Sequence, residues 1–229
     1  MDLRIKDIVE LLGVSEKTIY RWLKEKKIPA YRINHQYRFS RSDINEWLLQ
    51  NKINFTEKVF DLSQAKTPLS LRELVGRGIV EYNIEGNVVG EVIRNAVASM
   101  KIYGNLDKEA VIDALLSREE MMSTGIGHGI AIPHPRNPII TDAGFASVSI
   151  CMLASAIDFL SLDRVPVHTL FIVLSANPKR HLETLSRISF LCQREDFRKL
   201  LEERAPRNAI LTYLENIEKE FFNNKVETE

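Results

Sequence analysis

Residues 118–136 read Arg-Glu-Glu-Met-Met-Ser-Thr-Gly-Ile-Gly-His-Gly-Ile-Ala-Ile-Pro-His-Pro-Arg, the stretch of sequence that says most about both architecture and chemistry. Within it, His134 lies between two prolines. The ring of Pro133 fixes its own φ, and Pro135 biases His134 toward an extended backbone. The pattern predicts an imidazole held at the end of a short strand. Such preorganisation suits a nucleophile that must meet an incoming group in line.

Phosphoryl transfer is the chemistry that the surrounding residues favour. A neutral imidazole is available near pH 7, because its unperturbed pKa is about 6.5, and one ring nitrogen can attack while the other is held. The transfer needs positioning and charge stabilisation, for which Arg118 and Arg136 are candidate cations. His181 begins a second helical run, where an imidazole and backbone N–H groups could bind the phosphate. The glycines of the motif permit close approach of the backbone to such a ligand: Gly125, Gly127 and Gly129.

The other histidines have ordinary interpretations. We expect His128 to face solvent in a loop and His168 to lie within a packed strand. A zinc site built from His128, His134 and His181 has neither a standard spacing nor a matching cysteine or carboxylate. No metal and no cofactor are therefore expected.

Hydrophobic periodicity divides the region around the motif into alternating strands and helices. Strands are expected at 129–133, 147–153 and 167–175. The last of these is nearly all apolar, which places it at the centre of its sheet. Helices are expected at 90–100, 106–117, 181–193, 195–203 and 206–222. This alternation predicts an α/β domain over residues 71–223.

The N-terminal region, residues 1–52, differs from the rest in charge. It holds 11 Lys and Arg against 7 Asp and Glu, whereas the remaining chain holds 20 against 24. A basic head on an acidic body suggests a polyanion partner for the head. The expected elements are a helix at 5–12, a helix at 16–26 capped by Ser15, a hairpin of 30–33 with 37–39, and a helix from 42. Residues 53–70 lose this periodicity and are interpreted as a linker.

The second predicted helix separates apolar from basic side chains. Ile19, Trp22 and Leu23 share one face, and the opposite face is a basic stripe with one aromatic. Such a stripe suits an element laid in the DNA major groove, and arginines of the hairpin add cations that can reach phosphates. The candidate DNA-binding residues are Lys17, Thr18, Tyr20, Arg21, Lys24, Arg32 and Arg38. The alternative is a solvated charged face on a module that binds another protein.

The stretch Arg-Glu-x-Met-x-Ser-Thr-Gly-Ile-Gly-x-Gly-Ile-Ala-Ile-Pro-His resembles the signature of mannitol/fructose-type enzyme IIA domains of the bacterial phosphotransferase system, especially their nitrogen-regulatory branch. The resemblance continues through residues 166–171 and 181–186. It implies an enzyme IIA type 2-like fold, a mixed β-sheet flanked by helices. It further implies that His134 is the phosphorylated histidine, that His181 is the second active-site histidine and that Arg118 is the matching arginine. A histidine phosphocarrier protein would be the phosphoryl donor.

The head resembles the excisionase-type winged helix-turn-helix domains related to the MerR group. The residues that carry this resemblance are Val14-Ser15-x-x-Thr18-x-Tyr20-Arg21 and, after the hairpin, Asp43-Ile44-x-x-Trp47-Leu48. The two resemblances each have one departure. The wing tip is Asn34-His35-Gln36 where that family often has Gly-Arg-Arg. Pro135 stands where many enzyme IIA domains have glycine, which we expect to change local flexibility without removing the nucleophile.

Three functions are compatible with these features. The first is a transcriptional regulator in which phosphorylation of His134 changes how the head engages DNA. The second is a sugar-transport enzyme IIA that passes phosphate to a transporter-linked partner. The third is a DNA-binding or scaffold protein with an inert second domain. The first is favoured, because no apolar transporter segment accompanies the domain. The protein would carry phosphate through a covalent intermediate without turning over a small substrate alone.

Location and assembly follow from simpler signals. The start of the chain lacks the pattern of a signal peptide, and its longest apolar stretch, 165–176, is too short and too interrupted to span a membrane. Cys151 and Cys192 lie in apolar surroundings and are expected to be reduced core residues. A cytoplasmic protein without membrane insertion is therefore expected. A homodimer is possible, because winged-helix proteins often read paired half-sites.

Overall fold

The computed structural model of the chain describes residues 3–12, 14–33, 36–40, 43–44, 47, 69–103, 106–140, 142–161 and 163–226. The chain divides into two compact units, residues 1–67 and 68–229. The domain limits expected at residues 52 and 70 stay a prediction, because most of the segment between them lies outside the described residues.

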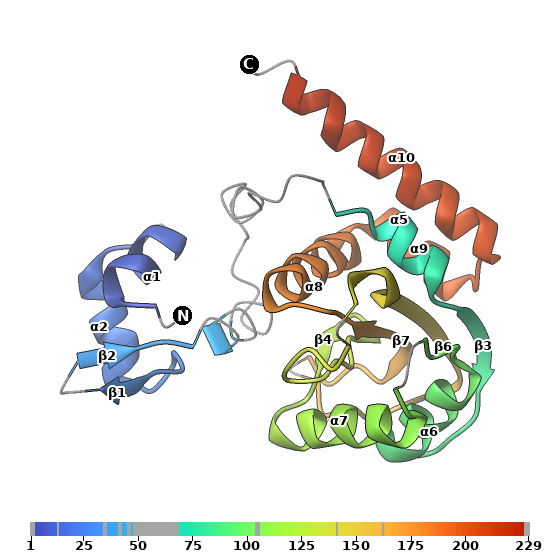
Figure 1. Ribbon diagram of the computed structural model, residues 1–229, viewed down its shortest axis with the longest axis horizontal. Helices are drawn as coiled ribbons and strands as arrows, with labels where there is room; N and C mark the ends of the chain where they lie inside the picture. Colours follow the sequence, from blue (N-terminus) through green and yellow to red (C-terminus); the bar gives the residue numbers. More distant parts are fainter. Residues whose placement is uncertain are drawn as a thin grey trace. The chain divides into compact units, whose positions relative to one another are not determined.

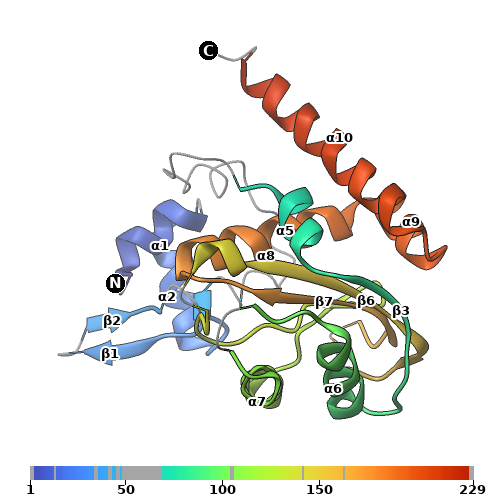
Figure 2. The same cartoon turned by 45° about the vertical axis from the view of Figure 1, so that its right-hand side comes forward.

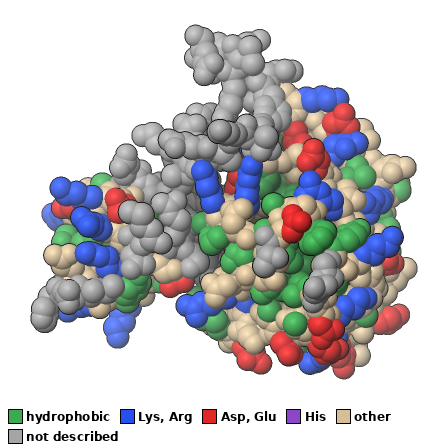
Figure 3. All heavy atoms as spheres, in the orientation of Figure 1, with side chains coloured by type: hydrophobic (Ala, Val, Ile, Leu, Met, Phe, Trp, Pro, Cys, Tyr) green, Lys and Arg blue, Asp and Glu red, His purple; other side chains and the backbone are tan. Residues whose placement is uncertain are grey.

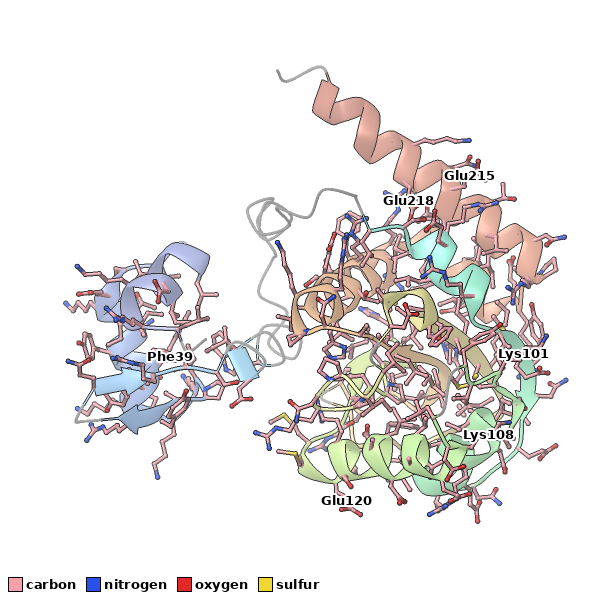
Figure 4. The ribbon with its side chains drawn as sticks, viewed as in Figure 1. Phe39, Lys101, Lys108, Glu120, Glu215 and Glu218 are labelled. Atoms are coloured by element: carbon pink, nitrogen blue, oxygen red, sulfur yellow. The ribbon has the colours of Figure 1, made fainter. Side chains whose placement is uncertain are left out.

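The first unit is a small helical head with a two-stranded hairpin (Figure 1). Its elements are α1 (Ile5–Leu12), α2 (Glu16–Lys24), β1 (Tyr31–Ile33) and β2 (Gln36–Arg38). Ser15 caps α2 by accepting a hydrogen bond from the backbone N–H of Thr18 at 3.2 Å, which satisfies a donor of the first helical turn. Phe39, labelled in Figure 4, is fully buried in the core of the head with Ile8 and Ile19.

The order of helix, turn, helix and hairpin agrees with the winged helix-turn-helix expectation. Two parts of that expectation fall outside the described residues. One is the wing tip at Asn34 and His35, and the other is most of the third helix, of which Asp43, Ile44 and Trp47 are described as helical.

The second unit is built on a five-stranded mixed sheet in the order β3-β6-β7-β5-β4. Its strands are β3 (Val80–Ile84), β4 (Gly125–Gly127), β5 (Ile130–Ala131), β6 (Ser147–Ile157) and β7 (Val167–Leu174). Pairs β3–β6 and β5–β7 are parallel, whereas β6–β7 and β4–β5 are antiparallel. The apolar strand β7 is central, as its sequence predicts, because a strand covered on both faces must be hydrophobic on both.

Helices cover both faces of this sheet (Figure 2). The helices α6 (Val89–Ser99) and α7 (Lys108–Met121) lie on one face, and α5 (Leu71–Arg77) and α8 (Pro178–Gln193) lie on the other. Two further helices follow, α9 (Glu195–Glu202) and α10 (Arg207–Val226). Cys151 and Cys192 are both buried in this core as free thiols. The expected mixed sheet flanked by helices is thus confirmed.

The start of the second unit is anchored by the last helix. Ser70 accepts a hydrogen bond from the backbone N–H of Glu73 and so caps α5. Glu218 on α10, labelled in Figure 4, accepts from the backbone N–H of Leu71 at 2.5 Å and from the hydroxyl of Ser70 at 2.9 Å. A carboxylate is favourable at this position, because the first turn of a helix carries partial positive charge. Ser70, which the sequence places in the linker, therefore belongs to the second unit.

Four elements differ from the sequence expectation in ways that matter for the site. Helix α7 continues to Met121, so that Arg118 lies on its last turn rather than in a loop. Helix α8 begins three residues before His181, because Asn177 caps it and Pro178 occupies its first turn. Strands β3 and β4 were not expected at all. Among the described residues, no helix has the combined length and apolarity needed to cross a bilayer.

Candidate functional site

His134 follows β5 and lies next to the end of β7. The backbone N–H of Val173 donates to the carbonyl of Pro133 at 3.0 Å, so the Pro-His-Pro segment continues the alignment of β5 with β7. The ring nitrogen Nδ1 of His134 is 2.7 Å from the carbonyl oxygen of Ile132. A carbonyl can only accept a hydrogen bond, so Nδ1 carries the proton and Nε2 carries the lone pair. The side chain is a held imidazole with a defined nucleophilic nitrogen.

His181 faces His134 from the first turns of α8. Their ring centroids are 5.1 Å apart at an angle of 56°. The side chain of Asn177 accepts from the backbone N–H of Arg180 at 2.9 Å, which fixes the start of the helix. The Nδ1 atom of His181 is 3.3 Å from the hydroxyl of Ser175, the residue that follows β7. His134 and Ser175 therefore lie just beyond the carboxyl ends of the parallel neighbours β5 and β7, and His181 joins them from a helix N-terminus that favours anions.

Arg118 supplies positive charge from the last turn of α7. It is only 3% exposed, and its Nη1 donates to the carbonyl of Met122 at 2.5 Å. After burial, which is the larger cause, its charge helps to lower the pKa of both His134 and His181. Arg136 is exposed, and its charge helps to lower the pKa of Arg118, after the larger effect of burial. His134 and His181 thus face each other, Arg118 contributes a buried positive charge that acts on both rings, and Arg136 lies exposed two residues after His134. The roles of the four residues stay a prediction.

Both histidines are neutral near pH 7. Burial is the main cause that holds the pKa of His134 well below 6.5, followed by the charges of His181 and Arg118. Burial, then the charge of Arg118, lowers the pKa of His181 to about 4. The site therefore combines two uncharged rings with a buried guanidinium, an arrangement that can accept a phosphoryl group with about two negative charges.

These shifts predict that stability falls in mild acid. Because the folded-state pKa is depressed, the unfolded chain binds protons at a pH where the folded chain does not. The stabilisation is complete above about pH 6.5 and is lost as the pH falls toward about 4 for His181. We expect His181 to lower the free energy of unfolding by about 1.4 kcal/mol per pH unit across that window, and His134, whose pKa is also lowered, to add to the loss. Urea denaturation at pH 7, 6 and 5 measures it.

The variant for this prediction is His181→Gln, which should remove that histidine's share of the slope. Identical slopes for wild type and His181→Gln would contradict the assignment.

Gly127 and Gly129 form the turn between β4 and β5. Their φ values are +93° and +71°, a region that favours glycine. A Cβ atom on Gly127 would lie 2.6 Å from the carboxylate of Asp163, and one on Gly129 would lie 2.3 Å from the ring of His168. These close neighbours and the positive φ values explain why glycine is required at both positions, without any ligand. Phosphate binding by the two glycines stays a prediction that these contacts do not support.

Two groups at the site escaped sequence reasoning. The hydroxyl of Ser175 contacts His181, and a polar residue directly after a buried strand is the signal that could have identified it. Glu119 accepts hydrogen bonds from Thr124 through both carboxylate oxygens. A glutamate beside a buried arginine gives no comparable signal, because most glutamates on helices are solvated.

The candidate nucleic-acid interface of the head is the outer face of α2. Ile19 is fully buried, whereas Lys17, Arg21 and Lys24 are exposed and share a face at spacings of three and four residues. Tyr20 is 52% exposed beside them. Figure 3 shows Lys and Arg side chains projecting from the head. Positive charge gathered on one helix is the footprint expected of a DNA-binding element.

The remaining predicted DNA contacts are less uniform. The hydroxyl of Thr18 is 3.0 Å from that of Ser15, so it belongs to the cap of α2. On the hairpin, Arg32 pairs with Tyr37 and stacks over its ring at 4.5 Å. Arg38 is opposite Tyr31. Because side chains alternate along a strand, Arg32 and Arg38 lie on opposite faces of the hairpin.

Residues 73–217 match the family model of the EIIA 2 domain of the phosphoenolpyruvate-dependent sugar phosphotransferase system. The chain belongs to this family. Residues 3–52 match the model of a helix-turn-helix domain. The EIIA 2 domain is therefore preceded in this family member by a second module of a different kind, which agrees with the charge difference between the two regions.

Relatives of this EIIA 2 domain include regulatory and sugar-specific proteins. The nitrogen regulatory protein of Pseudomonas aeruginosa is 34% identical over 140 residues, which cover 59% of this chain and 86% of that protein. The fructose-specific EIIABC component of Bacillus subtilis is 33% identical over 154 residues, which cover 66% of this chain but only 24% of that protein. The crystal structure of nitrogen regulatory protein IIA-Ntr from Neisseria meningitidis superposes with a TM-score of 0.53 at 26% identity, covering 62% of this chain and 97% of that one.

Proposed function

We propose that this protein is a cytoplasmic regulator that accepts a phosphoryl group on Nε2 of His134 from a histidine phosphocarrier and thereby changes DNA binding by its head. The observation that carries the proposal is the geometry of His134. Its Nδ1 proton is held by the carbonyl of Ile132, which leaves Nε2 as the free nucleophile beside His181 and Arg118.

The transfer can be written from these contacts. The lone pair on Nε2 of His134 attacks phosphorus, and the bond between phosphorus and the donor's imidazole nitrogen breaks. Its electron pair returns to the donor ring. Nδ1 of His134 keeps its proton, so the product ring is cationic and its N–H still donates to the carbonyl of Ile132. Arg118 and His181 stabilise the phosphoryl oxygens, which carry the charge in such transfers.

Regulation is favoured over sugar transport by the head. A helix-turn-helix module with an exposed basic helix gives the domain a polyanion partner that a transport component does not require. Phosphorylation adds about two negative charges, enough to change the engagement of a basic head with DNA in either direction.

The coupling is tested by measuring DNA affinity before and after phosphorylation. The unphosphorylated chain and the chain treated with phosphorylated phosphocarrier are each used to select DNA from a random pool. Dissociation constants of both forms for the selected DNA are then measured by gel shift at several salt concentrations. We expect the two forms to differ by at least about fivefold, the usual lower limit for a coupled pair of sites. Equal constants for the two forms would remove the coupling from the proposal.

The same assay tests the interface with Arg21→Ala. Loss of a base or phosphate contact on α2 should weaken binding by about tenfold, which corresponds to one such contact. Arg94→Ala, on an exposed arginine of the second unit, is the matched control and should bind DNA as wild type does. Unchanged binding by Arg21→Ala would show that α2 does not lie in the groove.

A further inference from the structure

Both carboxylate oxygens of Glu119 accept hydrogen bonds from Thr124. Its Oε1 accepts from the backbone N–H of Thr124 at 3.0 Å, and its Oε2 accepts from the hydroxyl of Thr124 at 2.5 Å. The side chain is largely withdrawn from water, and burial raises its pKa while the bonds from Thr124 oppose that rise. Withdrawal of a carboxylate from water is unfavourable unless hydrogen bonds replace the lost hydration. The contact with Thr124 is therefore a fixed one.

Thr124 in turn holds the segment that carries the nucleophile. It is 5% exposed, and its carbonyl accepts from the backbone N–H of Ile132 at 3.0 Å. Gly125 of β4 pairs with Ala131 of β5, so this bond between the next two residues continues the pairing on the side nearer His134. The carbonyl of Ile132 is the acceptor for Nδ1 of His134 at 2.7 Å.

These hydrogen bonds connect Glu119, near the end of α7, to the imidazole of His134. Glu119 fixes Thr124, Thr124 fixes Ile132, and the direction of the Ile132 carbonyl decides which ring nitrogen of His134 carries the proton. In both Thr124 and Ile132, the N–H and the carbonyl that take part belong to two different peptide groups. The hydrogen bonds therefore act on each other by fixing atomic positions and not by polarising one shared peptide group. A displacement at Thr124 would turn the carbonyl away from Nδ1, and small displacements of a reacting group are enough to slow a reaction strongly.

We propose that Glu119 is a positioning residue for phosphoryl transfer, which keeps His134 in the tautomer with Nε2 free by holding Thr124 against Ile132. The inference rests on the proposed function, since it assigns a role within the same site. It places no group in contact with the phosphoryl oxygens beyond those already named.

The test compares Glu119→Ala with Glu120→Ala in the full chain. The two glutamates are neighbours on α7, so their substitutions have the same helix propensity. Glu120, labelled in Figure 4, is exposed, whereas Glu119 contacts Thr124 and interacts with the charge of Arg118. The Thr124 variants below separate the contact with Thr124 from the effect of the charge. Imidazole tautomers are read by long-range proton–nitrogen NMR on the unphosphorylated protein. The rate of phosphorylation of each variant is measured at saturating and at limiting concentrations of phosphorylated phosphocarrier.

Glu119→Ala should lose the pure Nδ1–H signal of His134 and show a mixture of tautomers. Its maximal phosphorylation rate should fall about tenfold, the lower range for residues that orient a functional histidine through a second contact. The KM for the phosphorylated phosphocarrier should stay within about twofold, because the Glu119 carboxylate is bound to Thr124 and is not a docking group for the donor. Glu120→Ala should match wild type in all three measurements.

A second pair of variants keeps the test decisive if Glu119→Ala does not fold. Thr124→Val removes the hydroxyl that Glu119 accepts and should reproduce both effects, whereas Thr124→Ser keeps it and should restore wild-type values. Wild-type tautomer and rate in both Glu119→Ala and Thr124→Val would overturn the inference and leave the proposed function standing. A wild-type chain that takes no phosphate from the donor would overturn the proposed function, and the inference with it.

Discussion

His134→Ala will take up no phosphoryl group from phosphorylated phosphocarrier, whereas His128→Ala will be phosphorylated as fast as wild type. The substitution removes the nucleophilic Nε2, and no other described residue offers a neutral imidazole in the same position, because His181 uses Nδ1 toward Ser175 and lies across the site. His128 is exposed in the turn between β4 and β5. Intact-mass measurement should show one added phosphoryl group on wild type and none on His134→Ala.

Peptide mapping completes this experiment. The label on wild type should be acid-labile, as a bond between phosphorus and nitrogen is, and it should map to the peptide that contains His134. Label on His134→Ala at the wild-type rate would show that another residue is the acceptor and would overturn the proposed function.

Arg118→Ala should slow phosphorylation by about 100- to 1,000-fold, the effect of removing one preorganised group that stabilises developing charge. Arg118 is almost fully buried, so its charge is screened little by water. Arg118→Lys should recover only part of the rate, because an ammonium group cannot reproduce the planar fork of a guanidinium. Single-turnover experiments with saturating phosphorylated phosphocarrier measure the rate of phosphoryl transfer to each variant.

The control for Arg118 must separate catalysis from folding. Arg118 also donates to the carbonyl of Met122, so its removal changes the end of α7 as well as the charge of the site. Urea denaturation of each variant reports that structural effect. Arg94→Ala, on an exposed arginine of α6, should be labelled at the wild-type rate. A stable Arg118→Ala with wild-type kinetics would exclude the arginine from the transfer.

The elements nearest to strong local signals were predictable from sequence. The central position of β7 follows from its apolar run, and the cap of α2 follows from Ser15 before an amphipathic stretch. The start of α8 precedes the apolar periodicity of the helix, although Asn177-Pro178 is a good initiation signal. Strand β4 was missed because glycine-rich segments have no side-chain periodicity, and its pairing with β5 is a tertiary event.

The identity of the site's residues can be read from the chain alone: a histidine between prolines, a second histidine and an upstream arginine belong to one recognisable pattern. Local sequence also separates a basic head from an acidic body. The direction of the Ile132 carbonyl, the approach of Ser175 to His181 and the hold of Glu119 on Thr124 needed the folded structure. Hydrogen bonds and burial depend on where distant segments pack, so the tautomer and the lowered pKa of His134 arise only when β5, β7, α7 and α8 come together.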